Sequence, residues 1–487
     1  MVGVSGVRGI VGTDLTADVV TRWAQAFGTW ARQGTRHGGR GKGPSDRPTV
    51  RPSIVVGRDS RESGPMFAEA AGQGLVAAGC DVIDVGLVPT PTIQLAVEHH
   101  RAAGGIAITA SHNPIEWNAL KFIGPDGIFL DGVAGARVGQ LAVKGGRGRS
   151  EAGTVTTDKT AIDRHLDAVL QLPALDVEGV RRCGFIVALD AVRGAAGPVL
   201  RALLDRLGCH VAGINLETDG QFPRAPEPVP ENLSELGRLV RSVGAGLGLA
   251  VDPDGDRLAI VDEQGRAIGE DYTLAFAVRA VLGRATEGRK DGTTEGASGE
   301  RSVLPSFRHS VVVCNLSTSL VVEDAAREWG AEVVRTPVGE VHVARKMIEL
   351  ESRIGGEGNG GVMYADLHAG RDALVAAALV LQLLARTGKP VSEIVASGPR
   401  YVIVKAKSER GSRNAEQGLA AVYAALRARF PEASADTQDG LRLAWPDRWL
   451  HVRPSNTEPI IRLIAEAPTR VAAEQLVEEG RRGCAAS

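Results

Sequence analysis

The chain has 487 residues, of which 43% are hydrophobic and 23% charged, and its formal net charge is −2. A chain of this length exceeds what one hydrophobic core usually holds, so we expect about three or four domains. The near-neutral charge gives no electrostatic reason to expect a nucleic acid or an anionic membrane as a partner, and a small molecule is the expected partner instead.

The five cysteines are scattered along the chain and none forms a CxxC pair, which disfavours a disulfide framework and a zinc site. A cytoplasmic location is therefore expected. The first residues lack a basic segment followed by an apolar core, so we expect no secretory signal. The longest apolar stretch, residues 373–385, contains Gln382 and falls short of the ~20 residues that span a bilayer.

Three segments of the chain repeat the pattern strand, turn, helix, glycine, strand. They begin at Ser53, Phe185 and Val311, and each predicts a βαβ crossover with helices on the faces of a largely parallel sheet. The copies start roughly 130 residues apart, which corresponds to one domain each. Each copy is followed by a polar loop. Ligands of open α/β sheets bind outside the carboxyl ends of the strands, so three such loops could converge on one cleft; three unrelated loops are the alternative.

The end of the chain departs from this repeat. Short predicted strands, an amphipathic helix and a final helix indicate a smaller α+β domain with an antiparallel sheet, after a linker at 390–398. Residues 34–52 and 283–309 are rich in Gly, Arg, Ser and Thr, and we expect both to be mobile surface insertions. The predicted strands cover 401–406, 441–444, 449–452 and 460–464, and the first helix covers 415–430.

Ser111 is the candidate nucleophile. It stands in Thr109-Ala110-Ser111-His112-Asn113-Pro114, after an apolar run that predicts a buried strand. Pro114 prevents a smooth continuation into a helix, so the hydroxyl is expected on an exposed turn. The stretch lacks the G-x-S-x-G elbow of acyl hydrolases, and the adjacent His112 points away from the serine in an extended chain, which disfavours an acyl-transfer triad.

A second candidate site is acidic. Asp252, Asp254 and Asp256 stand at alternate positions between two apolar runs, so their oxygens can converge on one hard cation. Mg²⁺ suits a few carboxylates and accepts a phosphate oxygen as a further ligand. An EF-hand is disfavoured because Arg257 occupies the position that requires Gly. A structural Asp-rich turn is the other alternative, although repulsion among the carboxylates favours a metal.

Two further loops carry polar groups. The Gly-rich stretch 355–361 contains Glu357 and Asn359, which can bind vicinal sugar hydroxyls or an ammonium group. The stretch 453–459 follows a predicted strand and offers donors that suit a phosphate dianion. Taken alone, each loop could be an ordinary polar turn. The donors of the second loop are Arg453, Ser455, Asn456 and Thr457.

Together, these four motifs resemble those of the α-D-phosphohexomutase family, in the family's order and over essentially the full chain. The stretch 109–114 resembles its phosphoserine loop, 252–257 its magnesium loop, 355–361 its sugar-binding loop and 453–459 its phosphate-binding loop. The resemblance implies three related α/β domains with mixed, largely parallel sheets and a C-terminal α+β domain of the TATA-box-binding-protein type, around a central cleft. The expected domains are 1–155, 156–267, 268–388 and 399–487.

The resemblance also implies an activity. The expected enzyme is a phosphosugar mutase, an isomerase that interconverts hexose 6-phosphate and hexose 1-phosphate through phosphorylated Ser111 and a hexose bisphosphate, which is both intermediate and activator. One Mg²⁺ per chain is expected on the three aspartates and the Ser111 phosphate. The expected partner is a small phosphosugar, and the chain is expected to be a monomer or homodimer. The family's pattern further implies Lys121 or His112 in proton transfer, Arg257 in charge stabilisation, and Arg8 and His342 near the substrate.

The sugar loop bears on the substrate. Many bacterial family members carry Ser and His where this chain has Asn359 and Gly361, and the form found here resembles phosphoglucosamine mutases of the archaeal type. Glucosamine phosphate is the first expectation, with Glu357 near the 2-ammonium group, and mannose or glucose phosphate is the alternative. A phosphoserine-dependent phosphatase and a non-catalytic sugar-phosphate binder are remoter alternatives.

Overall fold

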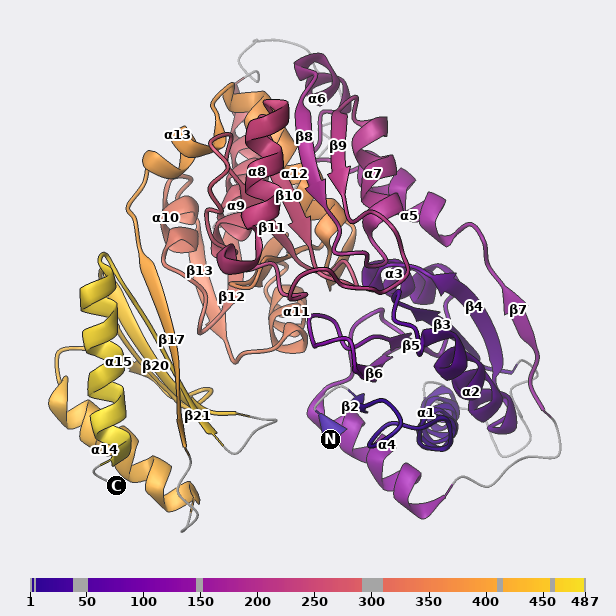
Figure 1. Cartoon of the computed structure of the whole chain (residues 1–487). Coiled ribbons are helices and arrows are strands. Elements are labelled where there is room, and N and C mark those ends of the chain that lie inside the picture. Colours follow the sequence, from indigo (N-terminus) through magenta and orange to yellow (C-terminus); the bar gives the residue numbers. More distant parts are fainter. Residues whose placement is uncertain are drawn as a thin grey trace, which may run out of the picture.

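The computed structural model describes residues 2–3, 6–37, 51–145, 152–290, 310–409, 415–455 and 460–485. Four separate sheets follow one another along the chain, and each is the centre of a domain (Figure 1). The first domain and the C-terminal domain lie on opposite sides below the two middle domains in Figure 1. The expected α/β class with a C-terminal α+β domain is confirmed.

The first domain is built on a mixed, seven-stranded sheet. The central strand β5 (Gly104–Ile108) is buried along its whole length, and the serine loop follows it directly at the carboxyl end of the parallel strands. Helices α1 (Ala17–His37), α2 (Gly64–Ala77), α3 (Thr90–His99) and α4 (Gly132–Lys144) belong to this part of the chain. In spatial order the strands are β1 (Val2–Gly3), β2 (Gly6–Ile10), β6 (Trp117–Ile123), β5 (Gly104–Ile108), β3 (Ser53–Arg58), β4 (Asp81–Leu87) and β7 (Val155–Thr157).

The second domain presents the acidic loop on a hairpin. Strands β8 (Ile186–Asp190), β9 (His210–Ile214) and β10 (Leu247–Val251) are parallel, whereas β11 (Leu258–Val261) returns antiparallel to β10. Both β10 and β11 are buried throughout, so the two ends of the loop 252–257 are held firmly. The helices are α5 (Ala161–Leu170), α6 (Val177–Cys183), α7 (Gly197–Arg206) and α8 (Ser234–Val243), with a 3₁₀ turn at Pro230–Asn232.

The third domain carries the sugar loop. Glu357 is the last residue of a parallel strand, and the strands that follow it run antiparallel. The expected apolar stretch forms α12 (Ala373–Thr387), which is buried from Ala373 to Leu384 and packs on α9 (Asp271–Lys290). Helices α10 (Val321–Arg327) and α11 (Glu340–Glu349) complete the domain. In spatial order the strands are β13 (Glu332–Thr336), β12 (Val311–Asn315), β14 (Ile354–Glu357), β15 (Gly361–Tyr364) and β16 (His368–Arg371).

The C-terminal domain is a five-stranded antiparallel sheet with α14 (Ala415–Arg429) and α15 (Arg470–Ala485) on one face (Figure 1). Because side chains alternate along β20 (Arg448–Pro454), Leu450 and Val452 pack under these helices and His451 faces the third domain. The expected antiparallel α+β unit is confirmed. In spatial order the strands are β17 (Val402–Glu409), β21 (Ile460–Ala467), β20 (Arg448–Pro454), β19 (Leu441–Trp445) and β18 (Ser434–Asp436).

The hydrophobic cores show which domains form a unit. The second and third domains share one continuous apolar core, while the first and the last each have a main core of their own, and Ile128 of the first domain joins a small cluster of the third. The acidic loop and the sugar loop are therefore both anchored to the same hydrophobic core. Among the described helices, none combines the length and the apolar character needed to cross a membrane.

Two expectations about connecting segments need correction. Most of the expected linker 390–398 forms helix α13 (Val391–Ala396), because Val391 and Ile394 bury their side chains in the shared core. The expected surface insertions begin later than predicted, since α1 continues to His37 and α9 to Lys290. Residues 38–50 and 291–309 lie outside the described residues.

Candidate active site

Ser111 is buried, not on an exposed turn as its flanking residues had predicted. It is 2% exposed, and its backbone φ of +49° lies in the left-handed region that side chains other than glycine disfavour. Thr109 Oγ1 holds this conformation by accepting the Ser111 N–H at 2.8 Å and donating to Asp59 at 2.6 Å. The Ser111 hydroxyl is thereby aimed at the acidic loop, where it donates to Asp252 Oδ2 at 2.8 Å.

Arg61 is the main support of the serine loop, although it belongs to none of the four sequence motifs. Its guanidinium is 1% exposed, pairs with Asp59 at 3.1 Å and donates to four backbone carbonyls of the loop at 2.6 to 2.9 Å. Five donors in a rigid fork allow one arginine to satisfy all these acceptors. The carbonyls belong to Ser111, Asn113, Pro114 and Trp117.

We expect Arg61→Met to destabilise the protein and to lower its activity. The substitution leaves Asp59 buried without its cation, and breaking a buried ion pair from one side typically costs about 3–5 kcal/mol. Urea unfolding measures this change in the free energy of unfolding. Arg201→Met, at an exposed arginine of α7 paired with Asp205, should change it by less than about 0.5 kcal/mol. A loss below about 1 kcal/mol for Arg61→Met would contradict the assigned role.

The acidic loop has the features of a metal site. Asp252, Asp254 and Asp256 are at most 1% exposed, and each offers an oxygen within 4.8 Å of the others. Asp254 Oδ1 and Asp256 Oδ1 are buried without a hydrogen-bond partner among the described residues. Burial and the neighbouring carboxylates of Asp256 and Asp254 hold the pKa of Asp252 well above its ordinary value. Buried carboxylate oxygens without donors are costly, so this donor set fits a hard divalent cation.

Lys121 connects the acidic loop with the first domain. The residue is 8% exposed, and its Nζ lies 2.8 Å from Asp254 Oδ2 and 3.8 Å from Asp256 Oδ2. The start of α3 makes a second connection, because Thr90 donates from its backbone N–H to the Asp254 carbonyl at 2.8 Å and from its hydroxyl to Asp254 Oδ2 at 2.9 Å. The serine, the lysine and the three aspartates therefore form one cluster at the boundary between the first two domains.

Three other predicted residues, His112, Arg257 and Arg8, lie beside the serine loop or the acidic loop. His112 is half-buried with Nδ1 3.4 Å from Ser111 Oγ, and burial together with the charges of Arg257 and Arg8 holds the pKa of His112 well below its ordinary value. The Arg257 guanidinium donates to Glu227 at 3.2 Å and lies 3.7 Å from Asp256. Arg8 donates to the Asn113 side chain at 2.7 Å. The imidazole of His112 is accordingly neutral near neutral pH.

The sugar loop lies against the acidic loop. The Gly360 carbonyl accepts the backbone N–H of Leu258 at 3.0 Å, and Gly360 has a φ of +86° with no room for a side chain, since a Cβ would lie 2.4 Å from the Leu258 carbonyl oxygen. Glu357 is 4% exposed. Although burial opposes its ionisation, Arg371 and Asn315 hold the pKa of Glu357 below its ordinary value. Asn359 donates to Glu357 Oε2 at 3.4 Å.

Arg371 and Glu340 complete this cluster, and the sequence motifs did not include them. The Arg371 guanidinium contacts Asp256, Glu340 and Glu357 at 2.6 to 3.0 Å. His342, the residue of α11 that was expected near the sugar, is exposed. Residues two apart on a helix face different directions, so α11 turns Glu340 into the buried cluster and His342 away from it.

Arg453 and Ser455, the described donors of the expected phosphate loop, lie at the end of β20, on the side of the C-terminal domain that faces the third domain. Arg453 Nε lies 3.0 Å from Asp439 Oδ2, which also accepts the backbone N–H of Val338 at 3.1 Å. The backbone N–H of Ser455 donates to the Ile460 carbonyl at 2.9 Å. Asn456 and Thr457 lie outside the described residues.

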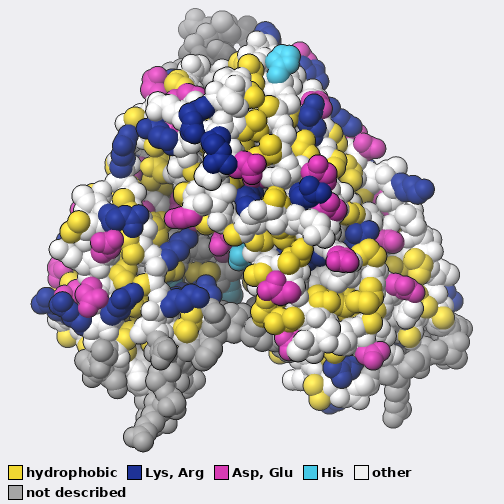
Figure 2. Space-filling model, viewed as in Figure 1, with side chains coloured by type: hydrophobic (Ala, Val, Ile, Leu, Met, Phe, Trp, Pro, Cys, Tyr) yellow, Lys and Arg dark blue, Asp and Glu magenta, His cyan; other side chains and the backbone are white. Residues whose placement is uncertain are grey.

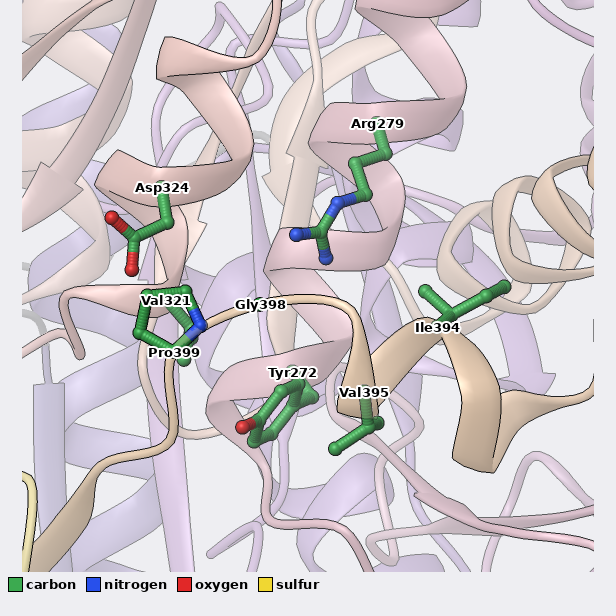
Figure 3. A pocket seen from close by; sticks show the side chains of 8 residues that line it. All are labelled: Tyr272, Arg279, Val321, Asp324, Ile394, Val395, Gly398 and Pro399. Carbon is green, nitrogen blue, oxygen red and sulfur yellow. The ribbon is translucent and has the colours of Figure 1, made fainter.

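The surface is hollowed between the C-terminal domain and the first domain, and Figure 2 shows Lys, Arg and His side chains along this hollow. A separate small pocket lies between α9, α10 and the segment after α13 (Figure 3). Its volume of about 10 Å³ holds at most one water molecule. No residue of the four loops lines it, so the pocket has no part in the candidate site.

Family models cover nearly the whole chain. The α/β/α domains I, II and III of phosphoglucomutase/phosphomannomutase match residues 1–141, 163–265 and 298–401, and the C-terminal domain matches 404–482. A phosphoglucomutase/phosphomannomutase of Thermococcus kodakarensis is 36% identical, with 98% of this chain and 97% of the relative covered. A probable phosphoglucosamine mutase of Methanopyrus kandleri is 35% identical, covering 98% and 96%.

A solved structure of the same family has the same fold. A phosphoglucomutase/phosphomannomutase family protein of Burkholderia thailandensis superposes with a TM-score of 0.80 at 28% identity, covering 99% of this chain and 96% of that one. Fold and relatives thus define a phosphohexomutase, an enzyme of the isomerase class that transfers phosphate within its substrate. The chain belongs to the phosphoglucomutase/phosphomannomutase family of α-D-phosphohexomutases.

Proposed function

We propose that the chain interconverts hexose 6-phosphate and hexose 1-phosphate through a phosphoryl group carried on Ser111. The hydrogen bond of 2.8 Å between Ser111 Oγ and Asp252 carries this proposal. It brings a hydroxyl of the first domain to the acidic loop of the second, although the two residues are 141 positions apart. Phosphoryl transfer depends chiefly on positioning and charge neutralisation. This pairing provides the positioning, and a cation held by the acidic loop would provide the neutralisation.

The metal in this proposal is Mg²⁺. Asp252 Oδ2, Asp254 Oδ1 and Asp256 Oδ1 would hold it, because the last two oxygens have no hydrogen-bond partner among the described residues and the first faces Ser111. When bound, Mg²⁺ neutralises charge on the transferring phosphoryl group. Lys121 and Arg257 add positive charge at the same place.

His112 is the group best suited to move the proton. In the first transfer the bond between phosphorus and Ser111 Oγ breaks, a bond from phosphorus to the sugar hydroxyl oxygen forms, and the hydroxyl proton leaves. A lysine ammonium has no acceptor, and Lys121 is paired with Asp254. The neutral His112 can accept the proton and pass one to Ser111 Oγ, which lies 3.4 Å from its Nδ1.

The second transfer uses the same groups in reverse. The hexose bisphosphate turns over in the cleft and presents its other phosphate to Ser111, which takes the phosphoryl group back. Glu357 and Asn359 are proposed to contact the substrate on the sugar-loop side of the cleft, and Arg8 on the side of the serine loop. His342, which α11 turns away from the buried cluster, is proposed only as a residue near the substrate. The phosphate that is not reacting is proposed to bind Arg453, Ser455, Asn456 and Thr457.

Glucosamine phosphate is the first candidate for the hexose. The Gly-Glu-Gly-Asn-Gly-Gly form of the sugar loop supports it, as does the name of the M. kandleri relative. Glucose or mannose phosphate is the second candidate. Glu357 already accepts four donors in this structure, and a carboxylate offers about four lone-pair sites, which leaves no site for the 2-ammonium group of glucosamine. The name of the T. kodakarensis relative supports this second choice. The donors are Asn315, Gly339, Asn359 and Arg371.

Catalytic efficiency on the 6-phosphates of glucosamine, glucose and mannose distinguishes these candidates. We expect isomer formation with all three and the highest kcat/KM with glucosamine 6-phosphate. A preference of more than about tenfold for glucose or mannose, ~1.4 kcal/mol of differential transition-state binding, would overturn the ranking. Release of inorganic phosphate without isomer formation would overturn the mutase activity itself and indicate a phosphatase.

A further inference from the structure

Arg371 joins the acidic loop to the sugar loop. It is the last residue of β16 and only 7% exposed. Its guanidinium donates to Asp256 Oδ2 at 2.6 Å, to Glu357 Oε2 at 3.0 Å and to Glu340 Oε2 at 3.0 Å. Each carboxylate belongs to a different segment: the acidic loop, the sugar loop and the start of α11.

The surroundings of Arg371 leave little freedom for its side chain. Gly361 lies under the arginine stem, where a Cβ would approach Arg371 Cδ to 2.3 Å. The Arg371 backbone N–H also donates to Glu340, at 3.4 Å. The neighbouring backbone is tied to the acidic loop as well, since the Ala373 N–H donates to the Gly255 carbonyl at 3.2 Å. A planar guanidinium with five donors can serve three acceptors at once, which a lysine ammonium on a flexible stem cannot do with the same geometry.

We propose that Arg371 is a positioning residue that couples metal binding to hexose binding. It occupies Asp256 Oδ2 and leaves Oδ1 of the same carboxylate for the cation. The same guanidinium orients Glu357 in the sugar loop. This inference rests on the proposed function, in which the acidic loop holds the metal and the sugar loop contacts the hexose.

Arg371→Lys tests the proposal, with Mn²⁺ as the probe of the metal site. Loss of a partner that orients a metal ligand typically costs roughly 10- to 100-fold in metal affinity. We expect the Kd for Mn²⁺, measured by titration without sugar, to rise by that amount, and KM for the hexose phosphate to rise by roughly tenfold as well. A matched control is Arg279→Lys, because Arg279 is also a buried arginine of the third domain but pairs with Glu328, outside all four loops.

A Kd for Mn²⁺ within about twofold of the wild-type value in folded Arg371→Lys would overturn the proposal, as would an equal loss in Arg279→Lys. If Arg371→Lys does not fold, Glu340→Gln removes one anchor of Arg371 and should still raise the Kd for Mn²⁺ by at least about threefold; an unchanged Kd there overturns the proposal too. The Mn²⁺ titration does not depend on turnover of the sugar. A wrong prediction for the Kd can therefore be told apart from a wrong proposed function, in which case the wild-type protein would not isomerise hexose phosphates.

Discussion

Ser111→Ala is expected to lower kcat/KM for hexose phosphate interconversion by at least about a thousandfold. The proposed reaction passes the phosphoryl group through Ser111 Oγ, and the neighbouring His112, Thr109 and Lys121 cannot replace this hydroxyl. Coupled assays of isomer formation measure the loss. Ser111 Oγ donates its hydrogen bond to Asp252, which is a proposed metal ligand. We therefore expect the free energy of unfolding to change little.

The control for this variant is Ser242→Ala, at an exposed serine near the end of α8 whose hydroxyl donates to the Leu239 carbonyl. It should retain wild-type kcat/KM. If Ser111→Ala kept more than about a tenth of the wild-type kcat/KM, Ser111 would not be the carrier. The phosphoryl group would then have to be carried by another residue or be transferred directly from one sugar to another.

Asp254→Asn is expected to produce the second large loss. Asp254 Oδ1 is one of the two buried oxygens of the acidic loop that have no hydrogen-bond partner among the described residues. Asp254 Oδ2 accepts hydrogen bonds from Lys121 and Thr90. An amide removes one negative charge from the ligand set and leaves Lys121 facing an NH₂ group or a neutral oxygen. We expect the affinity for Mn²⁺ to fall by at least about 100-fold and kcat by a similar factor.

Asp205→Asn is the matched control for Asp254→Asn, since Asp205 is an exposed aspartate of α7 in the same domain. Its affinity for Mn²⁺ should equal that of the wild type. Undiminished Mn²⁺ binding in Asp254→Asn would mean that the metal sits elsewhere, and the acidic loop would then be a structural turn.

The sequence predicted the loops better than the contacts between them. Ser111 and the three aspartates stand in short, chemically unusual stretches next to buried strands, so residue type and spacing were enough to single them out. Their convergence could be expected from the rule that polar loops gather at the carboxyl ends of parallel strands. The structure adds that Ser111 is buried, because it faces Asp252 in the acidic loop of the second domain.

Arg61, Glu340 and Arg371 could not be predicted in the same way. Each is a single charged residue, and its role comes from hydrogen-bond partners far away in the chain: Arg61 reaches the serine loop about 50 positions on, and Arg371 reaches Asp256 across 115 positions. One signal was present for Arg61, because Asp59 and Arg61 follow a buried strand in a polar turn. For Arg371, the only local signal was the neighbouring Asp372, which caps α12 through its side chain.

The intact mass of the purified protein tests the central claim most directly. We predict a species about 80 Da heavier than the sequence mass, with the phosphate on the peptide that contains Ser111. This added mass should disappear in Ser111→Ala and should decrease when excess hexose 6-phosphate is added, since the phosphoryl group then passes to the sugar. An enzyme that interconverts the isomers while Ser111 carries no phosphate at any stage would contradict the account.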